Sequence, residues 1–107
     1  MILISKYIVP KGFTGITLFP FIFLKETDFK DDKILVNHEK IHLKQQLELL
    51  IIFFYIFYLF EWFIKLIKYK NSYIAYKNIS FEREAYLNEK DFNYTKNRKF
   101  WAFLNYL

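Results

Sequence analysis

The two histidines of the chain, His38 and His42, lie four residues apart and enclose a glutamate, Glu39, in the segment His-Glu-Lys-Ile-His. On a helix this spacing places both imidazoles on one face, close enough to bind one metal ion. A carboxylate beside the first imidazole can reach a water molecule on that ion, and zinc lowers the pKa of such a water toward neutrality. The spacing therefore predicts a zinc site with His38 and His42 as ligands and Glu39 as general base.

A catalytic zinc site needs a third protein ligand and one open position. The sequence has no cysteine and no third histidine, so this ligand must be a carboxylate. Glu82 and Glu84, in a later helical segment, are the candidates. Phe81 and Ala85 lie four residues apart and mark the inward face of this segment, and Glu82 lies beside that face. We expect Glu82 to be the ligand and keep Glu84 as the alternative; the other interpretation is a charged outer helix face.

The elements that position these residues fit a single domain, residues 1–107. The composition is 54% hydrophobic and 23% aromatic, which excludes a disordered chain. Both prolines and both glycines lie in the first twenty residues, so a β-hairpin region, residues 1–30, is expected before a helical region, residues 33–107. The predicted fold class is α+β and mainly α, with the N-terminal β-hairpin packed on three to four helices.

The hairpin is predicted from two groups of strand-forming residues. Residues 2–4 and 7–9 form the expected first strand, Pro10 and Gly12 mark the turn, and residues 14–24 form the second strand. Pro20 is expected to create an edge or a bulge in that second strand, because proline cannot donate a backbone hydrogen bond.

The helical region starts with an unbroken run, residues 33–70, that Asp31 or Asp32 can cap. One straight helix of that length would measure about 57 Å, whereas a compact domain of this size has a radius of gyration of about 13 Å. Glu82 must also return to the histidines, so we expect a fold-back between residues 48 and 58. A third helical block is expected at residues 73–93, with a break at 78–80, and a short docking helix at 99–107.

The longest apolar run lies between Glu48 and Glu61 and is apolar on every helical face. Extended from Leu49 to Ile64, residues 49–64 approach the length of a membrane helix. Two alternatives follow, a core helix or a helix that docks on or inserts into a membrane. The N-terminus lacks the features of a secretory signal peptide, so an intracellular location, cytoplasmic or membrane-associated, is expected.

The net charge of +5 does not indicate a nucleic-acid partner. The basic residues are almost all lysines, and they are scattered along the chain instead of forming the stripe typical of phosphate binding. No nucleic acid is therefore expected among the partners.

The two metal-binding segments together resemble a known class of enzymes. A His-Glu-x-x-His helix followed by a helix with Glu-x-x-Ala is similar to the gluzincin metallopeptidases. The closest likeness is to the minigluzincins and to the membrane-embedded peptidases of the prenyl-protein protease and β-lactam-sensor types. The segment from Glu82 to Ala85 matches their pattern, and Tyr86 stands where the membrane families have aspartate. The resemblance covers residues 37–91.

This resemblance implies a zincin-like fold, a Zn²⁺ cofactor held by His38, His42 and Glu82, and Glu39 as general base in hydrolysis of a peptide or protein substrate. It also implies that the edge strand of a front sheet aligns the substrate by backbone pairing. The residues in that position are Gly15, Ile16 and Thr17.

Two further sets of residues are candidates for the cleft. Of Gln45 and Gln46, which follow the histidines, one is expected to line the cleft and the other to be solvated. A tyrosine hydroxyl can stabilise an oxyanion, and the candidates are Tyr76, Tyr86 and Tyr94. The leading prediction is thus a zinc-dependent metallopeptidase; the alternative is a small membrane-associated helical protein or interaction module without catalytic activity.

Overall fold

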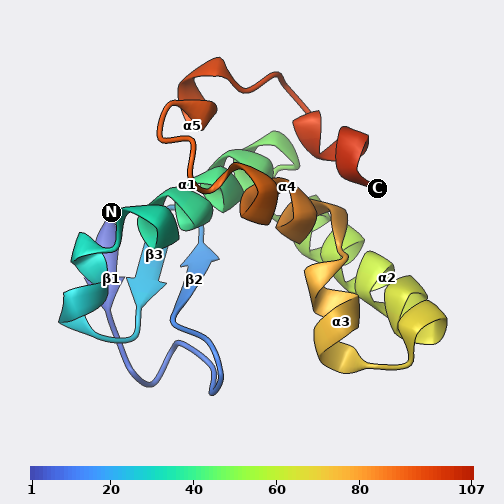
Figure 1. Ribbon diagram of the computed structural model, residues 1–107, viewed down its shortest axis with the longest axis horizontal. Coiled ribbons are helices and arrows are strands. Elements are labelled where there is room, and N and C mark those ends of the chain that lie inside the picture. Colours follow the sequence, from blue (N-terminus) through green and yellow to red (C-terminus); the bar gives the residue numbers. More distant parts are fainter.

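Three short strands form a sheet in the computed structural model, which describes residues 1–107 (Figure 1). They are β1 (Ile2–Ile4), β2 (Gly15–Leu18) and β3 (Phe21–Leu24), in the spatial order β1-β3-β2. β1 pairs with β3 in parallel, and β2 pairs with β3 antiparallel. β2 is therefore an edge strand, and it packs against helix α1 (Lys33–Glu48). The fold is α+β and mainly helical, as predicted.

A hairpin is present, but its strands differ from the prediction. β2 and β3 form it, and Phe19 and Pro20 lie in its turn, so Pro20 is not a bulge within a strand. A turn tolerates the missing N–H of proline, which would remove a ladder hydrogen bond from a strand. The expected first strand is limited to β1 because the Ser5 hydroxyl accepts hydrogen bonds from the backbone N–H groups of Tyr7 and Ile8. That local turn ends the strand.

The long helical run breaks into α1 and α2 (Ile52–Tyr69), as expected, and the pair is bent by 111°. The Asp32 carboxylate caps α1 by accepting a hydrogen bond of 3.0 Å from the backbone N–H of Leu35. At the bend, Leu50 and Ile51 have φ angles of 54° and 65°. These left-handed conformations reverse the chain inside the predicted interval.

The predicted break in the third helical block separates α3 (Ser72–Lys77) from α4 (Ser80–Asn88). The buried Glu61 of α2 accepts hydrogen bonds from the backbone N–H of Ser80, at 2.8 Å, and from its hydroxyl. A carboxylate stabilises a helix N-terminus because the free N–H groups there carry partial positive charge. Glu61 therefore ties α2 to the start of the helix that carries Glu82.

The C-terminal segment packs back over α4, as Figure 1 shows in red. It contains the short helix α5 (Tyr94–Asn97) and the 3₁₀ helix η2 (Ala102–Tyr106), and η2 is the predicted docking helix. Another 3₁₀ helix, η1 (Thr27–Asp31), precedes α1. The main hydrophobic cluster consists of Leu49, Phe54, Ile79, Phe81 and Phe103. The radius of gyration is 13.4 Å, in agreement with the expected value.

The core-helix alternative accounts for only part of the apolar run. Within residues 49–60, Leu49 and Phe54 are buried, whereas one whole face of α2 is exposed. No individual helix is both long enough and apolar enough to cross a membrane. α1 and α2 reach the necessary length and apolar composition only when they are counted together, and they form a bent pair.

Candidate metal centre

His38 and His42 lie one turn apart on α1, and α4, which crosses α1, brings Glu82 to them. The Oε1 atom of Glu82 lies 3.2 Å from Nε2 of His38 and 3.1 Å from Nε2 of His42. The two Nε2 atoms are 3.2 Å apart. Each of the three residues is only 5% exposed. Two imidazole nitrogens and one carboxylate oxygen therefore converge on a single point in the interior.

This convergence fits a zinc ion. In a tetrahedral site with bonds of 2.0–2.2 Å, neighbouring ligand atoms lie about 3.3 to 3.5 Å apart. The observed separations of 3.1 and 3.2 Å differ from this by a few tenths of an ångström. The other carboxylate oxygen of Glu82 accepts a hydrogen bond of 2.9 Å from the Tyr58 hydroxyl, which leaves Oε1 as the atom directed at the imidazoles.

The electrostatics of the group favour an anionic Glu82. Burial opposes its ionisation, but the positive charge of His42 and hydrogen bonds from both imidazoles hold the pKa of Glu82 well below its usual range. For His42, burial lowers the pKa, yet the charge of Glu82, its hydrogen bond and the charge of Glu39 outweigh burial and raise this pKa to about 9. A metal ion that binds here must therefore displace a proton from the cluster.

Each imidazole is oriented through its second nitrogen. Nδ1 of His42 lies 2.7 Å from Oε1 of Gln45, and Nδ1 of His38 lies 2.9 Å from Oε1 of Glu89. The Gln45 amide nitrogen donates to Glu84 at 2.9 Å and to the Phe81 carbonyl at 3.1 Å. Its oxygen is therefore the atom that faces His42. Because both Nδ1 atoms face acceptors, the protons of neutral imidazoles belong on Nδ1, and Nε2 is left to bind metal.

We expect Gln45→Met to weaken zinc binding by about 10- to 100-fold, because the loss of an oriented acceptor releases the His42 ring and its tautomer. Competition with a zinc chelator measures this change. Gln46→Met is the matched control: Gln46 is also buried, but it bonds the backbone of Thr17 and Phe19 instead of a ligand. Equal zinc affinities for the two variants would contradict an orienting role for Gln45.

Both glutamines are buried, so the expectation that one is solvated is wrong. Gln45 lies three residues after His42 on the same helical face, and this i, i+3 spacing is a signal that sequence reasoning missed. Glu89, Tyr58 and Glu61 carried no such signal, because each meets its partner through tertiary packing.

Glu84 is not placed at the imidazoles. Its side chain is fully buried and accepts hydrogen bonds from Arg98, from Tyr94 and from Gln45. The interpretation of Glu82 and Glu84 as an exposed, charged helix face is therefore wrong. Arg98, near the C-terminus, forms an ion pair with the carboxylate of Glu84. Tyr94 belongs to this cluster, so of the three tyrosines considered for oxyanion stabilisation only Tyr76 and Tyr86 lie at the pocket.

A pocket of about 650 Å³ opens beside the three potential ligands. The segment from Pro10 to Thr17 lines one side, α2 and α3 line the other, and Glu39, His42 and Glu82 contribute polar groups. A smaller pocket of about 280 Å³ shares Glu39 and Tyr76 with it. The general-base candidate therefore lines both pockets.

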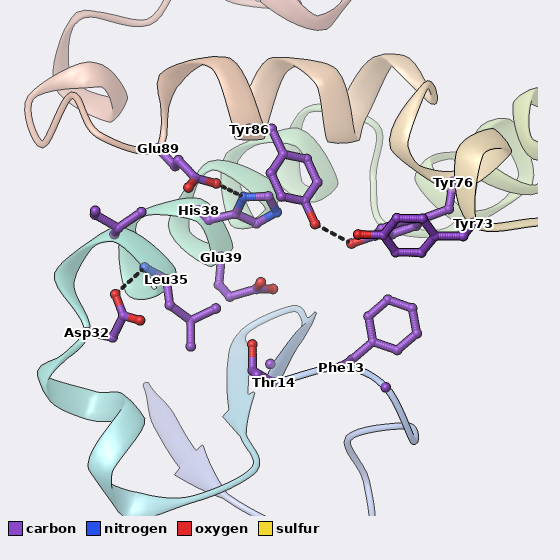
Figure 2. A pocket seen from close by; sticks show the side chains of 13 residues that line it. Phe13, Thr14, Asp32, Leu35, His38, Glu39, Tyr73, Tyr76, Tyr86 and Glu89 are labelled. Carbon is purple, nitrogen blue, oxygen red and sulfur yellow. Dashed lines mark hydrogen bonds and ion pairs between the residues drawn. The ribbon is translucent and has the colours of Figure 1, made fainter.

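Figure 2 shows the Glu39 side chain projecting from α1 into the smaller pocket, toward Thr14 and Phe13. Oε1 of Glu39 accepts a hydrogen bond of 2.8 Å from the Thr17 hydroxyl, whereas Oε2 accepts none from the protein. On another wall of this pocket, the hydroxyls of Tyr76 and Tyr86 lie 3.1 Å apart. Burial raises the pKa of both, so they are protonated donors at neutral pH.

The edge strand β2 brings Gly15, Ile16 and Thr17 to the larger pocket. The Thr14 carbonyl accepts from the Lys25 N–H, so Thr14 and, by alternation, Ile16 use their backbone groups to pair with β3. The backbone groups of Gly15 and Thr17 consequently point to the outer edge of β2. There the Thr17 carbonyl already accepts a hydrogen bond of 2.8 Å from the Gln46 amide, so the edge is open at Gly15. A Cβ on Gly15 would lie 3.0 Å from the Leu24 side chain and 3.6 Å from Glu39, which explains why glycine suits this close approach.

No known protein family, characterised protein or solved structure gives a significant match to this chain. The gluzincin resemblance therefore stays a prediction that rests on the two short motifs. At the position where that pattern has aspartate, the Tyr86 ring contacts the His38 ring, with 4.4 Å between centroids. Glu89, one turn later on the chain, provides the carboxylate that orients His38.

Proposed function

We propose that this chain is a zinc-dependent metallopeptidase. The observation that carries the proposal is the convergence of His38, His42 and Glu82 beside a pocket into which Glu39 also projects. Two imidazoles and one carboxylate form a ligand set that leaves a position open for water or substrate. The open edge of β2 adds support, because an extended peptide can pair with it.

A zinc ion in this site would polarise the scissile carbonyl and lower the pKa of water. Glu39 is the base that takes the proton from the attacking water, through the oxygen that accepts no hydrogen bond from the protein. Thr17 holds the other Glu39 oxygen and so fixes the direction of the carboxylate. The backbone of Gly15 aligns the peptide, and the Tyr86 and Tyr76 hydroxyls supply protonated donors near the reacting carbonyl.

The first test is the zinc content of the purified full-length chain after metal loading and desalting. We expect about one zinc ion per chain, and loss of this ion in His42→Ala and in Glu82→Gln. Glu26→Gln is the matched control, since Glu26 is an exposed glutamate outside the site. Circular dichroism verifies that each variant is folded. A wild-type chain without zinc, or a Glu82→Gln variant that retains it, contradicts the proposed ligand set.

The second test is hydrolysis. The zinc-loaded chain is incubated with a mixed peptide library, and the products are identified by mass spectrometry. We expect cleavages that a chelator abolishes and that added zinc restores. Zinc bound without any cleavage would instead assign the site a structural role and favour the non-catalytic alternative.

A further inference from the structure

One face of α2 is apolar and uncovered along the whole helix. In Figure 1 this helix lies at the periphery, with α3 packed along one side. Helical steps of about 100° place eight exposed residues within an arc of about 140°. We call this surface the outer α2 face; it consists of Ile52, Phe53, Ile56, Leu59, Phe60, Phe63, Ile64 and Ile67, each at least 48% exposed.

The chemistry of this face points to lipid instead of protein. A protein interface carries about one hydrogen bond per 100–200 Å² of buried area, whereas the outer α2 face has no side-chain donor or acceptor among its eight residues. Such a face offers a partner protein only apolar contacts. Acyl chains need no such groups, and a helix with one apolar face binds in the plane of a membrane interface.

The charge around the face identifies the kind of lipid. In helical steps of about 100°, Lys68 lies about 40° beyond the edge of the outer α2 face, and Lys70 follows the end of α2, whereas Lys65 lies on the opposite side of the helix. Residues 62–81 contain no acidic residue. Glu61, the acidic residue before this segment, is buried and accepts hydrogen bonds from Ser80. Clustered lysines beside an apolar helix face are attracted to anionic headgroups. The positive charge and the apolar surface therefore belong to the same helix.

We propose that the outer α2 face docks on the surface of an anionic lipid membrane, with α2 lying in the plane of the interface. This docking is independent of the metal centre and of peptidase activity. Leu59 belongs both to the outer α2 face and to the lining of the larger pocket. The docked chain therefore holds the opening of the pocket beside the lipid surface.

The test is co-sedimentation of the full-length chain with vesicles of phosphatidylcholine alone or of equal parts phosphatidylcholine and phosphatidylserine. We expect binding to the mixed vesicles that weakens as salt is added. The double variant Ile56→Ser/Phe63→Ser should bind roughly tenfold or more weakly, because it loses two apolar side chains that docking would bury in the lipid. Its control is Leu87→Ser/Phe100→Ser, which changes two residues that are exposed elsewhere and should leave binding unchanged.

A second variant isolates the charge: Lys68→Gln/Lys70→Gln should lose the preference for phosphatidylserine vesicles, whereas Lys65→Gln, on the opposite side of α2, should retain it. The proposal is overturned if the wild-type chain binds neither kind of vesicle. It is also overturned if the two double serine variants bind the mixed vesicles equally well. A lipid-free dimer in analytical ultracentrifugation that Ile56→Ser/Phe63→Ser dissociates would also overturn it, since the occupant is then a second copy of the chain.

Discussion

Glu39→Gln is expected to abolish most peptide hydrolysis while zinc binding is unchanged. The variant keeps the size of the side chain and an oxygen for the Thr17 hydroxyl, which lies 2.8 Å from Oε1 of Glu39. It removes the negative charge of Glu39 and with it the ability to take a proton. Because general-base catalysis contributes about 10²- to 10⁴-fold, we expect kcat to fall by that factor. This prediction depends on the proposed metallopeptidase function.

The measurement is the turnover of a peptide found in the library cleavage, together with the zinc content of the same preparation. Glu26→Gln again serves as the control, because it makes the same chemical change at an exposed position. If Glu39→Gln cleaves at the wild-type rate, another group is the base. If the variant loses zinc as well, its effect on hydrolysis says nothing about proton transfer, and the role assigned to Glu39 has to be replaced by a structural one.

The largest effect on stability is expected from Arg98→Met, at about 3–5 kcal/mol in the free energy of unfolding. Arg98 donates to both oxygens of Glu84, at 2.5 and 3.1 Å, and to Glu48 at 2.5 Å. Its side chain is only 2% exposed and that of Glu84 is fully buried. Burial opposes the charge, but the two carboxylates raise the pKa of Arg98 further above its ordinary value. Without the guanidinium, the fully buried carboxylate of Glu84 and the partly buried carboxylate of Glu48 both lose their cationic partner.

Urea unfolding of the metal-free chain measures this loss. Arg83→Met is the matched control, because Arg83, the other arginine of the chain, makes only an exposed hydrogen bond to the Leu107 carbonyl; a change within about 0.5 kcal/mol is expected there. Adding Glu84→Gln to Arg98→Met should recover part of the stability, since one of the buried charges is removed. Similar losses for both arginine variants would contradict a specific stabilising role of the ion pairs of Arg98.

Local spacing in the sequence identified the candidate metal ligands of α1. The i, i+4 separation of His38 and His42 and the position of Glu39 between them follow from helical geometry alone, whatever the rest of the fold. Local spacing could not decide between Glu82 and Glu84, because in helical steps of about 100° each lies about 60° from one of the inward residues Phe81 and Ala85, and both are buried. The packing of α4 on α1 decides that Glu82 is the one that meets the imidazoles. The fold-back near residue 50 was predictable from chain length, since a straight helix is too long for a domain of this size.

Tertiary structure decided the contacts between distant segments. Glu89 reaches His38 from 51 residues away, and Arg98 reaches Glu48 from 50 residues away; a helical period carries no information about such distances. The role of Pro20 depended on the pairing of β2 with β3. Tertiary packing also decided how much of the apolar run is buried, because α3, α4 and η2 cover only the inner face of α2. Sequence periodicity specifies which side chains share a face, whereas the packing of whole elements determines what that face meets.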